Sequence, residues 1–192
     1  MSGPGSGMRE RILAATYACV ARWGIAKTTV EDVAREASLS RATVYRTFPG
    51  GRDELIRDAV AWEVDNFFSR LAESVSSAAG FEEVVELALL HAHRAVREHE
   101  VLQKLLVTEA DRLVPTITME TGRLLPMIEA FVMPYLERER LRAGVDVAEA
   151  AAYVARMVTS HINAPGRWDL DDPEQVRDLV RAEILAGICD LS

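Results

Sequence analysis

The segment from Thr28 to Gly51 constrains the fold more than any other part of the sequence. Apolar residues at helical spacing predict a short helix over Val30–Ala37. Ser38–Ser40 breaks that helix, and Ser40 is a good N-cap for a second short helix over Arg41–Thr47. Pro49–Gly51 ends the second helix. Two short helices joined by a tight turn predict a helix-turn-helix motif.

The motif needs small residues where its helices cross and polar residues where its second helix faces outward. The residues expected to face the core are Val33, Ala34, Ala37, Leu39, Val44 and Phe48. Arg41, Thr43 and Arg46 are left facing solvent, and no acidic residue lies between Ser40 and Gly51 to neutralise them. This arrangement indicates a helix whose N-terminal end enters the major groove of DNA.

The rest of the chain also predicts helices. Aromatic residues make up only 6% of the chain, and no β-alternation of useful length occurs. A packing helix over Met8–Trp23 precedes the motif and stops at Gly24. Further helices are expected over about 52–77, 81–98, 101–111, 118–142, 147–163 and 173–191. Pro115 is expected to interrupt the chain's helical path, and Pro126 and Pro134 to kink or split the helix that contains them. We therefore expect an all-α fold of about nine helices.

Composition excludes several classes of protein. Hydrophobic residues make up 49% of the chain, enough for a core, but no run of about 18 apolar residues predicts a membrane span. Cys19 and Cys189 are too few for a disulfide scaffold or a four-ligand zinc site, so we expect reduced thiols in the cytoplasm. No nucleotide-binding, metalloprotease or hydrolase signature occurs. We expect no enzyme activity, no cofactor and no metal.

Charge is unevenly distributed along the chain. Residues 1–57 carry nine Lys or Arg and six Asp or Glu, a net charge of +3. The total of −8 leaves −11 for the remainder. A basic head on an acidic body indicates that only the head meets a polyanion.

The run TTVEDVA over Thr28–Ala34, with ASLSRATVY over Ala37–Tyr45 and then Phe48, resembles the signature of TetR-family transcriptional regulators. The family usually places a lysine three residues after the phenylalanine. Here the run from Phe48 to Leu55 has one extra residue, and Arg52 replaces the lysine. The resemblance implies a three-helix head on a helical body. We expect a disordered tail over 1–7, a DNA-binding domain over 8–52, and a ligand-binding and dimerisation domain over 53–192.

The resemblance also implies which residues meet DNA. Thr29, Tyr45 and Arg52 would contact phosphates, and Arg41, Thr43 and Arg46 would face base edges or phosphates. Arginine can bind guanine in bidentate fashion, which agrees with these roles. The expected DNA-binding residues are Thr29, Ser40, Arg41, Ala42, Thr43, Tyr45, Arg46 and Arg52. For Tyr45, packing at the domain seam is the alternative.

The body is expected to pair two chains, because two heads one helical turn apart read a palindrome. Apolar stripes on the last two helices could form that interface or only close the chain's own core: Ala148, Ala151, Ala152, Ala155, Val158, Ile162, Val176, Leu179, Val180, Ile184 and Ile188. The resemblance favours the interface.

In the family the body binds a small molecule, which here is expected to be apolar. Candidate pocket residues, each with a place in the core as the alternative, are Trp62, Phe67, His91, Met119, Met127 and Phe131.

The function implied is a DNA-binding repressor that acts as a homodimer and leaves its operator when an effector binds. Two alternatives remain open. One is a DNA-binding regulator without a small-molecule ligand, and the other is an all-helical adaptor that binds protein.

Overall fold

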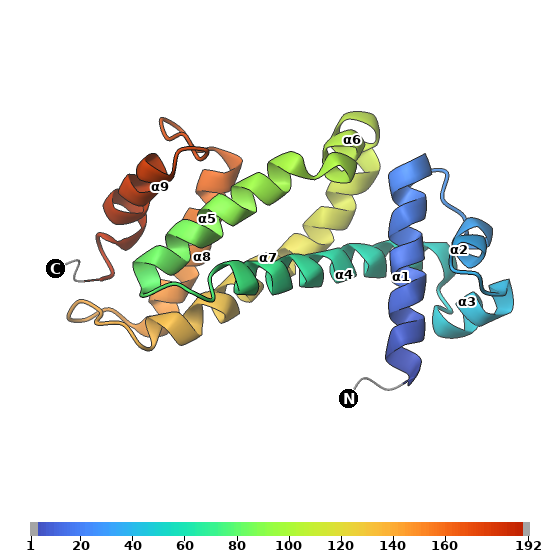
Figure 1. The fold of residues 1–192 in the computed structure, drawn as a ribbon, viewed down its shortest axis with the longest axis horizontal. Coiled ribbons are helices and arrows are strands. Elements are labelled where there is room, and N and C mark those ends of the chain that lie inside the picture. The colour runs from blue at the N-terminus through green and yellow to red at the C-terminus, as the bar shows by residue number, and fades with distance from the viewer. Residues whose placement is uncertain (1–3, 190–192) are drawn as a thin grey trace. The chain divides into compact units, whose positions relative to one another are not determined.

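The computed structural model describes the backbone of residues 4–189 and the side chains of residues 7–111 and 124–189. Within this range the chain is all-helical, with nine α-helices, one π-helical segment and no strand (Figure 1). The helices are α1 (Pro4–Trp23), α2 (Val30–Glu36), α3 (Arg41–Thr47), α4 (Gly51–Ser74), α5 (Phe81–Glu98), α6 (Glu100–Thr108), α7 (Ala110–Leu136), α8 (Val147–Asn163), α9 (Pro173–Leu179) and the π-helix η1 (Val180–Leu185). The all-α prediction is confirmed.

Several predicted bounds are also confirmed. The bounds of α3 and α5 are as predicted, and Asp146 caps α8 through hydrogen bonds from the backbone N–H groups of Ala148 and Glu149. Gly24 ends α1 with φ +87°, a conformation that glycine adopts without strain. At the N-terminus α1 begins at Pro4, inside the predicted tail, and residues 1–3 lie outside the described residues.

The predicted interruption at Pro115 is wrong, and so is the predicted alternative of a split at Pro126 and Pro134. The helical path breaks at Glu109, where φ is −145°, and not at Pro115. The helix α7 then continues from Ala110 to Leu136 through Pro115, Pro126 and Pro134 without a split.

The chain divides into two compact units. Unit 1 comprises residues 1–68 and 99–120, and unit 2 comprises residues 69–98 and 121–192. The division places α6 in the same unit as the helix-turn-helix. The division between the units also falls inside α4 and inside α7. The predicted domain boundary at residues 52 and 53 lies near the start of α4, a helix whose residues belong partly to each unit.

Unit 1 is built around α1, against which α2 packs, and α3 packs against α2 (Figure 1). Its main core contains Ile12 and Cys19 of α1, Val33 of α2 and Val44 of α3, together with Phe48. Every core position predicted for the motif is buried except Leu39, which is half-buried and packs against the same core. This core holds the motif rigid from behind and leaves its outer side open.

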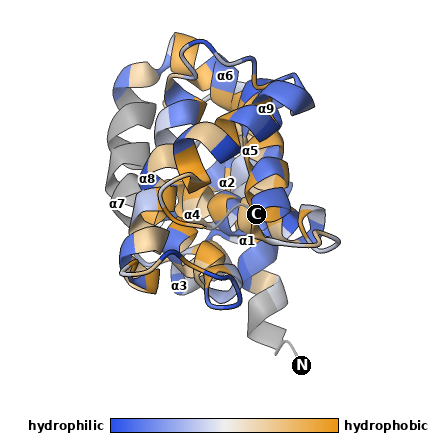
Figure 2. Cartoon of the chain, turned by 90° about the vertical axis from the view of Figure 1, so that its left-hand side faces the viewer, coloured by the Kyte–Doolittle hydropathy of each residue, from blue (hydrophilic) through white to orange (hydrophobic). Residues whose placement is uncertain are grey.

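Unit 2 is built around α5, which packs against α8, α9 and η1. Its core includes Leu89 of α5, Leu136 of α7 and Val154 of α8, all completely buried. Figure 2 shows hydrophobic and hydrophilic residues side by side along α5 and α9, as expected of helices that bury one face. The last helices are therefore part of the chain's own core.

This packing corrects the predicted contact residues of the dimer. The stripe residues that are buried inside the single chain are Ala151, Ala155, Val158, Val176, Leu179, Val180, Ile184 and Ile188. They are not free to meet a partner, because α5 and the neighbouring helices already cover them. Ala148 is exposed, and Ala152 and Ile162 are half-buried.

The segment η1 follows α9 directly and is wound as a π-helix over Val180–Leu185. Within it, Val180, Ile184 and Leu185 are buried, whereas Arg181 and Ala182 are exposed. The carboxylate of Glu183 accepts a hydrogen bond from the indole Nε1 of Trp168 at 2.9 Å. The side chain of Glu183 is thus held on the outside of the segment by the α8–α9 loop.

Candidate nucleic-acid interface

The helix α3 is capped at its start and packs into the core of unit 1 in its middle and at its end. At its start, the side chain of Ser40 accepts a hydrogen bond from the backbone N–H of Thr43 at 3.1 Å. In its middle, Val44 is completely buried, and Phe48 at its end is completely buried as well. Val44 and Phe48 belong to the core that also contains residues of α1 and α2, and Ser40 closes the first turn of α3 itself.

The opposite side of α3 is exposed. Arg41, Ala42, Tyr45 and Arg46 all point to solvent, and Tyr45 is one of the few large apolar side chains in the described residues that is exposed, at 43%. A methyl group added at Gly51 would lie 3.4 Å from the ring of Tyr45. The ring therefore lies close over the start of α4 and still presents its outer side to solvent.

The first residue of α3 has an acidic partner that the sequence analysis did not identify. The Nη1 atom of Arg41 lies 2.5 Å from Oε1 of Glu31, which is in the first turn of α2. Both side chains are about half exposed. The helix α3 itself contains no acidic residue, as the sequence shows, but an acidic residue of α2 lies beside Arg41.

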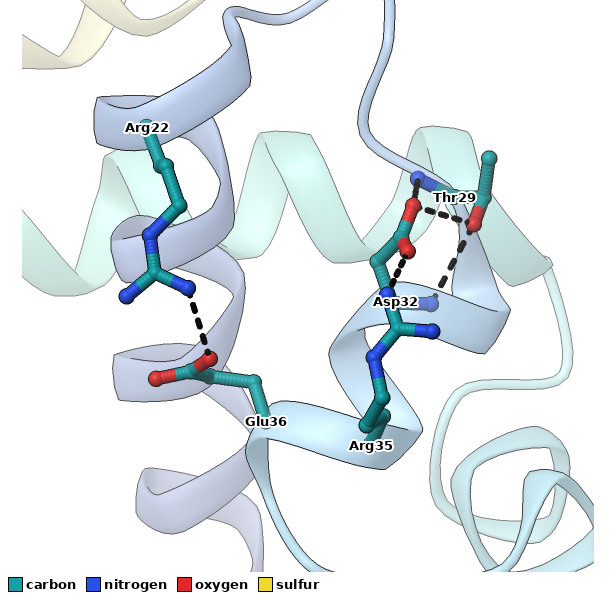
Figure 3. A network of polar contacts seen from close by, with 5 residues as sticks. All are labelled: Arg22, Thr29, Asp32, Arg35 and Glu36. Atoms are coloured by element: carbon teal, nitrogen blue, oxygen red, sulfur yellow. Dashed lines mark hydrogen bonds and ion pairs between the residues drawn. The ribbon is translucent and has the colours of Figure 1, made fainter.

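Each of the other acidic side chains of α2 also has an arginine partner (Figure 3). Glu36 lies 3.6 Å from Arg22 of α1, and Asp32 pairs with Arg35 of the same helix. Asp32 and Glu36 are therefore each paired with an arginine that lies outside α3.

Thr29 caps α2 through a reciprocal pair of hydrogen bonds with Asp32 (Figure 3). The hydroxyl of Thr29 donates to Asp32 at 2.6 Å, and the backbone N–H of Asp32 donates to the hydroxyl oxygen at 3.2 Å. The hydrogen bonds from Thr29 lower the pKa of the Asp32 carboxyl. The single hydroxyl hydrogen of Thr29 is thus engaged within the protein, so a phosphate contact here would need this bond to be exchanged.

Arg52 has a structural task beside the phosphate contact predicted for it. Its Nε donates to the backbone carbonyl of Thr28 at 2.8 Å, and its Nη2 donates to that of Ile25. These carbonyls belong to the connection between α1 and α2. Arg52 therefore ties the start of α4 to the entry of the motif, and about a third of its side chain is exposed.

Comparison with known proteins agrees with this geometry. Residues 12–59 match a protein family described as bacterial regulatory proteins, tetR family. The segment that contains the helix-turn-helix therefore has the sequence pattern of the tetR family. The matched range covers α2 and α3 completely, most of α1, and the start of α4.

Solved structures show that the TetR-like fold extends over the whole chain. A TetR-family transcriptional regulator from Mesorhizobium loti MAFF303099 shares 18% identity, covers 98% of this chain and 100% of its own, and has a TM-score of 0.66. A transcriptional regulator from Streptomyces coelicolor A3(2) shares 20% identity over 91% of this chain and 96% of its own, with a TM-score of 0.64. The fatty acid degradation regulator FadR from Bacillus halodurans shares 16% identity over 96% and 98%, with a TM-score of 0.56. No curated protein sequence matches the chain.

In this TetR-like fold α6 is joined to the head by polar contacts at the end of α1. The Nζ atom of Lys104 donates to the backbone carbonyl of Ala21 at 2.9 Å. The carboxylate of Glu109 accepts from the backbone N–H of Ala26 at 2.7 Å. Leu105 is buried with Ile25 and Ile56 in a small core of its own. The partners in the two hydrogen bonds are 83 residues apart along the chain, so no local sequence signal could have indicated them.

The predicted pocket residues do not all fall in one unit. Trp62 and Phe67 belong to unit 1, whereas His91, Met127 and Phe131 belong to unit 2. Within unit 1, Trp62 packs against the core of the head, and the ring of Phe67 contacts that of Phe68 edge-on. The side chain of Met119 lies outside the described residues.

Within unit 2, His91 has a buried Nε2 atom. Burial lowers the pKa of the His91 imidazole, and the nearby charges of Arg70 and Arg94 lower it further. Phe131 packs against Tyr135, with ring centroids 5.8 Å apart. The environment of His91 thus favours a neutral imidazole, which suits an apolar neighbourhood.

Unit 2 also has a pocket of about 440 Å³ that is open to solvent. It is lined by Val75, Ser76, Ala78, Ala79, Gly80, Phe81, Val84, Tyr135, Arg138 and Glu139. None of the predicted pocket residues lines it. Glu139 accepts a hydrogen bond from the backbone N–H of Phe81 at 2.9 Å, which fixes one wall.

Other kinds of site were sought in the described part of the chain. No group of three or more metal-ligating side chains is close enough there to hold a metal ion. Cys19 and Cys189 are both buried as free thiols, and burial raises the pKa of Cys19 to about 11. No described helix has both the length and the apolar character needed to cross a membrane. The family and fold are those of transcriptional regulators, which are generally not enzymes.

Proposed function

We propose that this TetR-family regulator binds operator DNA by inserting α3 into the major groove. The observation that carries the proposal is the polarity of α3: Val44 anchors it, while Arg41, Ala42, Tyr45 and Arg46 face outward. Arginine donors can bind guanine, and hydroxyl groups can bind phosphate oxygens. The expected contacts at Thr29, Ser40, Thr43 and Arg52 complete the same surface.

The decisive variant replaces two exposed residues of α3. Arg41→Ala with Tyr45→Ala removes one cation and one aromatic hydroxyl and leaves Val44 and Phe48 in place. We expect this double variant to lose retention of promoter fragments from the host genome, measured by gel shift. Arg140→Ala removes one positive charge from the exposed α7–α8 loop and serves as the control.

The dependence of binding on salt separates DNA recognition from protein binding. A regulator that neutralises phosphates loses affinity steeply as salt rises, because bound cations are released from DNA. A double variant that folds and still retains the fragments as the unaltered protein does would contradict the proposal. Absence of any salt-dependent DNA binding by the unaltered protein would instead favour the all-helical adaptor.

We also propose that two chains act together, as TetR-family regulators do. Two recognition helices about 34–36 Å apart would read the two halves of a palindrome. Because the inward stripes of α8 and α9 are used by the chain's own core, we propose that the outward faces of these helices meet the partner. Ala148, Ala152 and Arg156 lie four residues apart on the outward face of α8. Light scattering should give twice the mass of one chain, and a mass of one chain would exclude the pair.

The finer part of the proposal is repression that a small apolar effector relieves. The supporting observation is the position of α6. It follows α5 of unit 2 after His99 alone. Lys104 of α6 contacts the end of α1, and Glu109, the C-cap of α6, contacts Ala26 in the turn after α1. An effector that binds unit 2 and shifts α5 would therefore also shift the turn that leads into α2. Such a ligand acts by favouring one of two conformations.

Apolar compounds that raise the melting temperature provide the test. We expect at least one such compound to release a bound promoter fragment. Glu109→Ala is expected to keep the rise in melting temperature and to weaken the release, because the contact with Ala26 is lost. If every stabilising compound leaves DNA affinity unchanged, the chain is a DNA-binding regulator without a small-molecule effector.

A further inference from the structure

The exposed cations of unit 1 fall into two groups according to their acidic neighbours. Arg41 lies against the carboxylate of Glu31, with 2.5 Å between Nη1 and Oε1. Arg46 and Lys27 are also exposed, and neither has an ion pair or a hydrogen bond to any residue that the structure describes. The two groups should behave differently when a polyanion approaches.

We infer that Glu31 makes Arg41 a base-reading residue and leaves phosphate binding to Arg46 and Lys27. The inference rests on the proposed DNA-binding function and assigns Glu31 as a positioning residue for it. Glu31 lies on α2 and Arg41 is the first residue of α3, so the pair joins the two helices of the motif.

The argument depends on the charge of the group that approaches Arg41. A phosphate that binds the guanidinium would come close to the Glu31 carboxylate, and two like charges at that separation repel each other. The O6 and N7 atoms of guanine are neutral acceptors and carry no such penalty. The pair uses Nη1 of Arg41, so the other guanidinium N–H groups remain able to donate to a base edge.

The pair also limits where the Arg41 side chain can go. An arginine without a partner samples many rotamers and can follow whichever phosphate is nearest. Glu31 is in the first turn of a helix whose own N-cap is closed by Thr29 and Asp32, so its backbone position is fixed. A guanidinium paired with this carboxylate is drawn toward one part of the groove, which favours the reading of one base pair.

The test compares selectivity with salt dependence. A pool of random 30-base-pair duplexes, selected on the unaltered protein, supplies a preferred duplex, and a shuffled duplex of equal composition is the reference. Affinity for both is measured from 50 to 200 mM salt. We expect Glu31→Gln to reduce the preference about tenfold and to steepen the dependence of log affinity on log salt by about 0.9, because Arg41 gains a phosphate.

Two further variants sharpen the test. Arg46→Ala should make the salt dependence shallower by about 0.9 and keep most of the preference. Arg41→Lys keeps the positive charge but loses bidentate geometry, so it should lose the preference and keep the salt dependence. A melting curve for each variant verifies that it is folded.

The outcomes separate this inference from the proposed function. The inference is overturned, and the proposed DNA binding is retained, in either of two cases. In the first, Glu31→Gln leaves both the sequence preference and the salt dependence unchanged. In the second, Arg41→Lys binds the preferred duplex as selectively as the unaltered protein does. If the unaltered protein shows no preference for any duplex and no salt-dependent binding, the proposed function itself fails.

Discussion

The short helices α3 and α9, both seven residues long, differ in which side chains they expose to solvent. In unit 1, α3 buries only Val44 and exposes its remaining long side chains. In unit 2, α9 buries Val176 and Leu179, and η1 continues with Val180, Ile184 and Leu185. The first helix is a support for side chains that act outside the molecule, and the second is part of the molecule's own interior.

This difference shows why an exposed polar helix and an apolar stripe carry unequal information about function. A short helix with arginines and a tyrosine on its outer face contributes little to the core, so its surface needs another explanation. An apolar stripe is explained as soon as any neighbouring helix covers it. Substitutions should therefore affect stability in unit 2 and binding in unit 1.

The largest expected effect is on the stability of unit 2. Ile184 is completely buried, so Ile184→Ala removes apolar contacts and leaves a cavity. We expect a loss of about 2–5 kcal/mol in the free energy of unfolding. Arg41→Ala, which breaks only an exposed ion pair, should change the same quantity by less than about 1 kcal/mol. Urea denaturation followed by circular dichroism measures both, and equal losses would break the comparison.

A smaller effect is expected at the start of α3. Ser40→Ala removes the side-chain acceptor for the Thr43 backbone N–H, which should destabilise the helix by about 1 kcal/mol. Hydrogen exchange at the amides of α3 should become faster, while the amides of α9 keep their protection. Ser160→Ala, an exposed serine within α8, serves as the control and should leave both helices unchanged. Faster exchange in α9 as well would mean that the two units do not respond separately.

The smallest expected effect is a dependence of stability on pH that belongs to unit 2. Burial and the charges of Arg70 and Arg94 hold the pKa of His91 below its ordinary value of 6.5. The unfolded chain then binds a proton more readily than the folded chain does, so stability falls as pH decreases from 6.5 toward the folded pKa. His91→Gln should remove this part of the fall. If melting temperatures of the two proteins decrease in parallel below pH 6.5, His91 does not contribute.

Local signals in the sequence were enough to predict the helix ends and the buried residues of the helix-turn-helix region. Ser40 and Gly24 mark helix ends through short-range hydrogen bonds and backbone geometry, and both occur where they were predicted. Val44 and Phe48 are buried as their four-residue spacing indicated. Each of these features depends on residues close together in the chain, which is why a single sequence suffices to predict them.

Features that depend on distant residues were not predictable. The apolar stripe of α9 indicated that the helix packs, but it could not indicate against what, and the covering helix α5 lies about 90 residues earlier. The contact of Glu109 with Ala26 is of the same kind. The pairing of Glu31 with Arg41 was not predicted either, because the distance between them depends on the angle between two helices. The pocket residues and the DNA contacts stay predictions.

The π-helical winding of η1 has a consequence for how the C-terminal part tolerates changes of length. A π-helical turn accommodates more residues than an α-helical turn, so it can absorb an inserted residue without rotating the flanking segments. Leu179 before it and Ile188 after it can thus both remain buried. Deleting the exposed Ala182 would let the segment adopt an ordinary α-helical turn. The helix α8 has no π-helical turn, so a deletion inside it would rotate every later residue of that helix out of its native position.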